Sequence, residues 1–503
     1  MDRTLRRRRF LQAASAMGLG AGLGAVATRI TPARAAEMVV TPEAVRLRPE
    51  IEPVVRWIEE VPRDRAFDAA VDHLARGLSY RDLLAGLFLA GIRNIKPRPV
   101  GFKFHAVMVM NSAHLLGQTA AVEDRLLPMF WALDNFKRSQ EQDVKEGDWT
   151  LAVVDEPRVP GAGRAREEFV RAMDRWDADA ADAAVAGLCR SAGAAEVMEP
   201  FWRMGLRDHR NIGHKPIFTM QCWRTLQAIG WQHAEPVLRS LAFGQLDLQG
   251  DKDPAPAGPY EANLANVRKV RDGWQVGRTD PAATTAVLDA IRHADAEGAS
   301  AAVVAQLNRG VAPESLWDAV ALGAGEVMMR KPGILAIHAV TASNALHFTY
   351  GAAADPTTRL LALLQAAGWL PLMRDRNTAA DGPAIDSIEP VSPDATGDEA
   401  VGEVFSALDS DRRKAAAKAI GYLGKGGSPD LIFDAARRLI FRKGRDAHDY
   451  KFGAAIWEEF RLAADPRWQG PLTAAALFNF PGSGSPDSPL MRQAVEAVAR
   501  LKA

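Results

Sequence analysis

Apolar side chains recur every three or four residues through most of the chain, which is the spacing of one face of an α-helix. Between residues 194 and 208, Val197, Phe201, Met204 and Leu206 follow close to this period. Alternating β-branched runs are rare, and the main candidate strand, residues 149–154, is short. The pattern therefore predicts an all-α protein. The clearest predicted helices of the first half span residues 65–77, 80–94, 121–142, 165–175, 178–190, 194–208, 215–229 and 234–244.

Helix starts and chain breaks agree with this interpretation. Ser79 precedes an apolar run, and Pro313 with Glu314 precedes another, as is common at helix N-termini. Two stretches rich in Asp, Pro and Gly, residues 251–258 and 377–397, interrupt the helical pattern and are predicted to be loops.

One ten-residue segment occurs twice. Residues 105–114 and residues 338–347 both read H-A-V-x-x-x-N-x-x-H, with five of ten positions identical. A third histidine repeats as well, because His214 follows His114 by 100 residues and His448 follows His347 by 101 residues. Histidine is scarce, with ten in 503 residues, so chance does not readily explain three matched pairs.

The repeat predicts two homologous helical halves that arose by internal duplication and pack around a histidine-lined pocket. An offset of 233 residues also places Gly77 on Gly310 and Pro99 on Pro332 without a gap. The predicted organisation is a signal peptide at 1–35, a first half at 36–250, a linker region at 251–282, a second half at 283–482 and a C-terminal helix at 483–503.

The N-terminus has the composition of an export signal. Arg7-Arg8-Arg9-Phe10-Leu11 resembles the twin-arginine pattern and precedes a Gly- and Ala-rich apolar run. Residues 33–35 read A-R-A, so cleavage is expected after residue 35. We therefore expect the twin-arginine export machinery as a partner and a periplasmic or extracellular location. No other stretch is apolar enough to predict a membrane span after processing.

Composition narrows the function classes. The 62 basic and 62 acidic residues balance, which argues against a nucleic-acid-binding protein. The two cysteines lack the spacing of a zinc site or of haem attachment. Neither a dinucleotide-binding glycine motif, nor a P-loop, nor a serine-hydrolase elbow occurs in the sequence.

The duplicated histidines are the best candidates for chemistry. On a regular helix, positions nine residues apart point to opposite sides, so His105 and His114 cannot both face one ion unless His105 lies at the helix start. Asn111 and His114 do share a face, as do Asn344 and His347. His214 precedes a predicted helix, and a helix N-terminus disfavours imidazolium and so favours the neutral form that a metal ligand needs.

The predicted roles follow from these positions. We expect His114, His214, His347 and His448 to bind a metal, and His105 and His338 to act on the substrate with Asn111 and Asn344 orienting it. Imidazole suits several transition metals, and we rank iron before zinc and copper. The alternative interpretation is that the histidines form structural hydrogen bonds between buried helices.

Two segments resemble a known family. Gly213-His214-Lys215-Pro216-Ile217 resembles the G-H-P-x-I segment of questin oxidase-like proteins, with Lys215 interrupting the motif. Residues 338–346 resemble the segment of that family in which a His is followed by Thr, Ser and Ala. The resemblance extends over about residues 60–370. It implies an oxidoreductase that inserts oxygen into a cyclic organic substrate or cleaves it oxidatively, with His214 and His338 in the site.

Three functions are therefore compared. The first is an exported, oxygenase-like oxidoreductase that acts on a small organic substrate in a histidine-lined, metal-containing pocket. The second is a metal-dependent hydrolase or lyase, in which the metal activates water. The third is a helical binding protein without enzymatic activity, in which the histidines are structural.

Overall fold

The computed structural model describes residues 44–207, 209–247, 258–377 and 382–501. These residues form 23 α-helices and no β-strand, which confirms the all-α prediction. The candidate strand at 149–154 contributes only an isolated bridge, between Ala44 and Ala152. Among the described residues, none of the helices is long and apolar enough to cross a membrane. The predicted signal peptide at 1–35 and most of the loop at 251–258 lie outside the described residues.

All eight helices predicted for the first half are present, with bounds shifted by a few residues. The helix predicted at 121–142 begins later, at Leu127, after a turn. The helices up to residue 247 are α2 (Glu52–Glu60), α3 (Ala66–Ala75), α4 (Tyr80–Asn94), α5 (His105–Met108), α6 (Met110–Gln118), α7 (Leu127–Lys145), α8 (Ala162–Asp174), α9 (Ala178–Ser191), α10 (Ala194–Gly205), α11 (His214–Ile229) and α12 (Ala234–Gln245).

The remaining helices continue to the C-terminus. They are α13 (Tyr260–Val267), α14 (Pro281–His293), α15 (Ala296–Asn308), α16 (Pro313–Arg330), α17 (Ile334–Ala352), α18 (Pro356–Arg376), α19 (Gly397–Ala407), α20 (Arg412–Gly424), α21 (Pro429–Lys443), α22 (Ala447–Leu462), α23 (Gln469–Leu477) and α24 (Pro489–Ala499). The segment predicted as a linker, 251–282, thus contains α13, which buries Tyr260 and packs against α15 and α18.

Local sequence explains where key helices start. The Ser79 side chain accepts a hydrogen bond from the backbone N–H of Asp82 and caps α4, as its position suggested. Asp446 caps α22 in the same way, and Asp449 completes a reciprocal capping box. The second of these caps fixes the start of the helix that carries His448.

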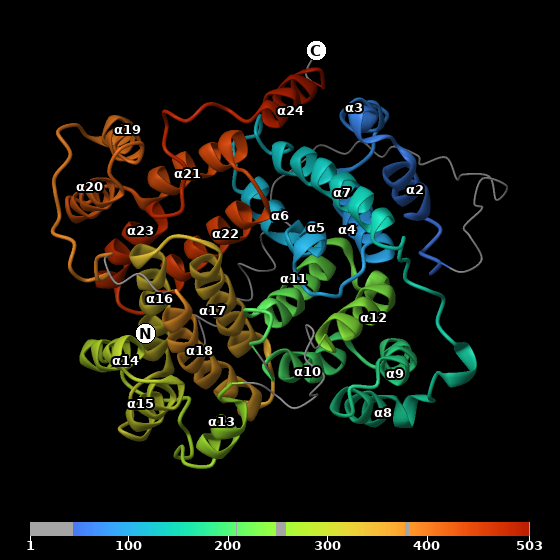
Figure 1. Cartoon of the computed structure of the whole chain (residues 1–503), viewed down its shortest axis with the longest axis horizontal. Helices are drawn as coiled ribbons and strands as arrows, with labels where there is room; N and C mark the ends of the chain where they lie inside the picture. Colours follow the sequence, from blue (N-terminus) through green and yellow to red (C-terminus); the bar gives the residue numbers. More distant parts are fainter. Residues whose placement is uncertain (1–43, 208, 248–257, 378–381, 502–503) are drawn as a thin grey trace.

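Four helices form a closed ring at the centre of the molecule. Helix α6 packs against α11, α11 against α17, α17 against α22, and α22 against α6. Figure 1 shows these four helices around the middle of the view, with α8 to α10 and α12 on one side and α18 to α21 on the other. Two helices of the ring lie before residue 230 and two lie after residue 333, so its interior brings together residues that are far apart along the chain.

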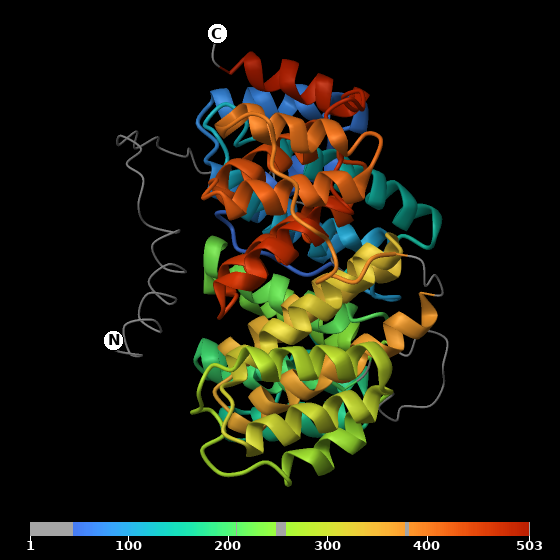
Figure 2. The ribbon, with the colours of Figure 1, turned by 90° about the vertical axis from the view of Figure 1, so that its left-hand side faces the viewer.

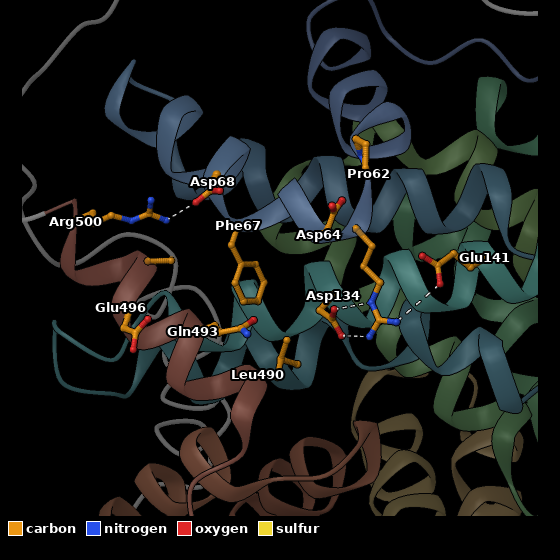
Figure 3. A pocket seen from close by; sticks show the side chains of 12 residues that line it. Pro62, Asp64, Phe67, Asp68, Asp134, Glu141, Leu490, Gln493, Glu496 and Arg500 are labelled. Carbon is orange, nitrogen blue, oxygen red and sulfur yellow. Dashed lines mark hydrogen bonds and ion pairs between the residues drawn. The ribbon is translucent and has the colours of Figure 1, made fainter.

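The last helix returns to the beginning of the fold. Helix α24 packs against α3 and α7, and it lies beside the N-terminal helices in both views (Figures 1 and 2). A groove runs between α24 and these helices, and charged side chains line it (Figure 3). Arg500 pairs there with Asp68, and Arg63 pairs with Asp134, each at 2.7 Å. No histidine lines this groove, so it is separate from the duplicated segments.

Gly213 fixes the entry into α11. Its φ of 83° is left-handed, and a Cβ atom on it would lie 2.4 Å from the Cβ of Ala342 on α17. We predict that Gly213→Ala lowers the free energy of unfolding by about 3 kcal/mol, because backbone strain and overpacking add. Gly310→Ala is the matched control, since Gly310 has a φ of 81° but no atom within 4 Å of its would-be Cβ.

The control should lose only about 1 kcal/mol, which is the strain of the left-handed backbone. Urea unfolding of the two variants measures both values. Equal losses would mean that the close approach of α11 and α17 at Ala342 is not a constraint on the fold.

Candidate metal centre

Four histidines from four helices meet in the interior. His105 is the first residue of α5, which leads directly into α6, and His214 is the first residue of α11. His338 lies in the second turn of α17, and His448 is the second residue of α22. Helices α11, α17 and α22 of the central ring therefore supply one imidazole each, and α5, which leads into α6, supplies the fourth. We call these four residues the histidine cluster.

The rings of the histidine cluster form two close pairs. The Nε2 atoms of His105 and His448 are 2.8 Å apart, and those of His214 and His338 are 2.9 Å apart. Both pairs have ring centroids 4.4 Å apart, and the neighbouring pairs His105–His214 and His338–His448 are at 5.0 and 5.2 Å. One ligand nitrogen each of His105, His214 and His338 lies within 4.8 Å of the others, so these three could hold a metal ion.

Backbone carbonyls determine the tautomers of the central pair. His214 Nδ1 lies 2.6 Å from the carbonyl oxygen of Asn211, and His338 Nδ1 lies 2.8 Å from that of Ile334. A carbonyl can only accept, so both Nδ1 atoms carry hydrogen. In the neutral imidazoles the two Nε2 atoms are then unprotonated, and they face each other at 2.9 Å.

A carboxylate fixes the tautomer of a third ring, that of His448. His448 Nδ1 lies 3.0 Å from a carboxylate oxygen of Asp446. Burial on its own would raise the pKa of Asp446, but the hydrogen bonds and charge of His448 together with the charge of Lys451 outweigh it and lower this pKa to about 2. Asp446 is therefore ionised and accepts the Nδ1 hydrogen. His105 is the exception, because its Nδ1 has no hydrogen-bond partner among the described residues.

This arrangement fits a bound cation. Unprotonated nitrogens of His214 and His338 repel each other at 2.9 Å unless a proton or a metal ion lies between them. Two nitrogens at roughly 2.0–2.1 Å from one zinc ion are about 2.9 Å apart at a right angle and about 3.4 Å apart at the tetrahedral angle. Small outward movements of the rings are therefore enough to accommodate a metal. An Nδ1 hydrogen bond to a carbonyl or carboxylate is also the usual support of a histidine ligand.

Electrostatics keeps the histidine cluster neutral. Burial and the positive charge of Lys451 hold the pKa values of His105 and His214 well below 6.5. Burial, the neighbouring His214 and Lys451 do the same for His338, and burial with Lys451 lowers the pKa of His448. Neutral imidazole is the form that binds a metal.

His114 and His347, which were predicted as metal ligands, lie outside the three-histidine group. His114 Nδ1 is 3.2 Å from the hydroxyl oxygen of Tyr80. His347 stacks on Trp317 with centroids 4.3 Å apart, and its Nδ1 is 2.8 Å from a carboxylate oxygen of Glu459. The nine-residue spacing explains both positions, since each turns away from His105 or His338 on the same helical stretch. His105 and His338, which were predicted as catalytic, belong to the group instead.

The two asparagines differ from each other. Asn344 donates hydrogen bonds to Glu458 at 3.1 Å and to Glu459 at 2.8 Å, so it shares a partner with His347 as their spacing suggested. Asn111 is buried, and its side-chain oxygen has no hydrogen-bond partner among the described residues. No contact of either asparagine with the histidine cluster is observed among these interactions.

Four supporting groups were not foreseen from the sequence. These are Asp446, the carbonyl oxygens of Asn211 and Ile334, and Lys451. The position of Asp446 two residues before His448 was a usable signal, because an Asp there can both cap a helix and orient the ring. The backbone carbonyls cannot be recognised from the sequence, because every residue has one. The burial of Lys451 next to the histidine cluster depends on how α22 packs against its neighbours.

His114 and His347 occupy matching sequence positions but titrate in opposite directions. Burial lowers the pKa of His114 from 6.5 to about 4. Burial on its own would also lower the pKa of His347, but the Glu459 carboxylate together with the charges of Glu458 and Asp318 outweighs it and raises this pKa above 6.5. An NMR titration of the two imidazoles should therefore find His114 neutral and His347 charged at pH 6.5.

The two groups also make opposite contributions to stability. Because the unfolded chain binds a proton at His114 more readily, its contribution to the free energy of unfolding falls as the pH drops from 6.5 towards 4, by about 2 kcal/mol. The contribution of His347 is complete below pH 6.5 and is lost as the pH rises through its higher folded pKa. Urea unfolding of the wild type, His114→Gln and His347→Gln measures the His114 contribution below pH 6.5 and the His347 contribution above pH 6.5. Parallel pH curves for the two variants would contradict the assignment.

The histidine cluster can thus bind a cation through neutral nitrogen donors, and its donor set suits iron, copper, zinc or nickel. No protein-family model matches the chain, and no curated protein or solved structure matches it.

Proposed function

We propose that this protein is a metal-dependent oxidoreductase whose metal is held by His105, His214 and His338, with His448 as a fourth donor. The observation that carries the proposal is the pair of unprotonated Nε2 atoms of His214 and His338, which face each other at 2.9 Å because backbone carbonyls hold both Nδ1 hydrogens. A buried site arranged in this way is costly to the fold unless a cation occupies it.

Iron or copper bound by these imidazoles would supply a redox-active centre next to an organic substrate. The chain's own residues hold the donors in place. Asn211 and Ile334 orient His214 and His338 through their carbonyl oxygens, and Asp446 orients His448. His214 and His338 are buried, and the low polarity of a buried environment strengthens electrostatic interactions between them and a bound cation.

An oxygenase-like reaction is the preferred chemistry. The resemblance to questin oxidase-like proteins rests on segments around His214 and His338, and these two side chains form one of the close pairs. We therefore propose oxygen insertion into, or oxidative cleavage of, an organic substrate. The same donor set also suits zinc, which would favour a hydrolase or a lyase instead.

We further propose that the two halves arose by duplication. The order of helices supports this, since α2 to α4 and α7 to α12 have counterparts in α14 to α16 and α18 to α23, and α17 corresponds to α5 with α6. Packing agrees with it, because α8 contacts α9 and α9 contacts α12, as α19 contacts α20 and α20 contacts α23. Exchanging the halves also converts the His105–His448 pair into the His338–His214 pair.

Metal analysis tests the proposed function. We expect the protein purified from its native host to contain about one iron or copper ion per chain. His214→Ala and His338→Ala should each lower metal affinity by more than about tenfold, since even the loss of a supporting hydrogen bond costs that much. His293→Ala is the control, because His293 is largely exposed and pairs only with Asp289. The metal content, the colour and the melting temperature are measured together.

The outcomes separate the three functions. Zinc in place of iron or copper would favour the hydrolase or lyase. If no preparation contained metal, and His214→Ala and His338→Ala melted at the wild-type temperature, the metal site would be overturned. A binding protein without a metal would then be the remaining function. His114→Ala and His347→Ala should retain the metal. Metal loss in these variants would instead identify His114 and His347 as ligands, as the sequence predicted.

We also propose export through the twin-arginine route, on the basis of Arg7, Arg8, Phe10 and Leu11 and of the A-R-A sequence at 33–35. Mass spectrometry of the exported protein should find Ala36 at the N-terminus. Replacing Arg7 and Arg8 by Lys should retain the uncleaved chain inside the cell. Normal export of that variant would contradict this route.

A further inference from the structure

Lys451 is a buried cation next to the histidine cluster. Its side chain is 2% exposed, and its Nζ atom has no hydrogen-bond partner among the described residues. It lies three residues after His448 on α22, so the two side chains project from the same face of the helix. Its charge acts on all four histidines and lowers the pKa of each one. The amine is therefore buried on the helix face that carries His448, and its charge reaches all four rings of the histidine cluster.

The carboxylates close to Lys451 in the sequence already have other hydrogen-bond partners, so they do little to stabilise its amine. Asp446 is the carboxylate whose charge favours protonated Lys451, and Asp446 is already engaged by the Nδ1 of His448. Asp449 is engaged as well, by the backbone N–H groups of Arg445 and Asp446. A buried amine without an acceptor costs several kcal/mol in either protonation state. Burial accordingly lowers the pKa of Lys451 to about 7.

A metal ion would make the charge imbalance larger. The four imidazoles are neutral donors, so a divalent ion would keep its full charge, with Lys451 beside it and Asp446 as the nearest compensating carboxylate. The N-termini of α11 and α22 also point towards this region, because His214 and His448 start these helices. Helix N-termini add positive potential. The described residues would thus leave the site with an excess of positive charge, which a negatively charged ligand would balance.

We propose that Lys451 donates a hydrogen bond to an anionic ligand that binds beside the metal in the histidine cluster, and that this ligand is an anionic oxygen of the substrate or a small inorganic anion. This inference rests on the proposed metal site and specifies what that site accepts. Lys451 is a binding residue in this arrangement and not a metal ligand. The substrate class is therefore narrowed to molecules that present a negatively charged oxygen.

Azide binding to the copper-loaded protein tests the inference without a known substrate. Azide is an anion that coordinates copper and produces a charge-transfer absorption band, so its affinity can be titrated. Lys451→Met keeps the length of the side chain and removes the amine. We expect this variant to bind one copper ion per chain as the wild type does, but to bind azide at least about tenfold more weakly, as expected for the loss of a charged hydrogen bond. Lys451→Arg should recover part of the affinity.

Lys137→Met is the matched control for the loss of a buried lysine. Lys137 lies on α7 and donates to the carbonyl oxygens of Ile58 and Glu59, away from the histidine cluster. Its replacement should lower stability and leave the azide affinity unchanged. The affinities of formate and of a set of aryl carboxylates then distinguish the two kinds of ligand. A site for a substrate should bind the larger aryl carboxylates more tightly than formate, whereas a site for a small inorganic anion should not.

Two results would overturn the inference while leaving the metal site intact. One is equal azide affinity in the wild type and in Lys451→Met. The other is loss of copper from Lys451→Met with the fold retained, which would make the amine a ligand of the metal. Failure of the wild type to bind copper, iron or zinc is a different result, and it would overturn the proposed function itself.

Discussion

The centre of this fold is governed by the repulsion between two nitrogen lone pairs. His214 and His338 are 124 residues apart in the sequence, and both donate their Nδ1 hydrogen to a carbonyl oxygen of their own local backbone. Their Nε2 atoms are left unprotonated at 2.9 Å. A proton or a metal ion between the two nitrogens would remove this repulsion. The turn before α11, the start of α17 and the close approach of these helices at Gly213 all serve to maintain the contact.

Helix α17 places its two histidines in opposite electrostatic environments. His338 and His347 are both on α17, nine residues apart, and they point away from each other. His338 faces other imidazoles and an ammonium group, and its charged form is disfavoured. His347 faces Glu459, with Glu458 and Asp318 near it, and its charged form is favoured. Identical residues in one element therefore differ in protonation because the neighbouring helices differ, which is why the repeat alone could not assign their roles.

Much of the fold could be predicted from the sequence, because helical periodicity is a local property. The eight helices of the first half and the cap at Ser79 were all expected. The histidines were the correct residue type to consider, and the nine-residue argument correctly separated His105 from His114. It could not say which of the two faces the interior, since that depends on which neighbours pack on each side. The carbonyl of Asn211 and the burial of Lys451 depend on tertiary packing and leave no signal in the sequence pattern.

The closure of the central ring has a consequence for how the protein is made. Both close nitrogen pairs join one histidine before residue 215 to one after residue 337, so neither part of the chain contains such a pair by itself. The three-histidine group is present once α17 has left the ribosome, but the fourth histidine arrives only with α22, and α24 then packs back against α3 and α7. The complete cluster of four histidines is therefore a late product of biosynthesis, and it forms only in a chain that has been made almost to its end.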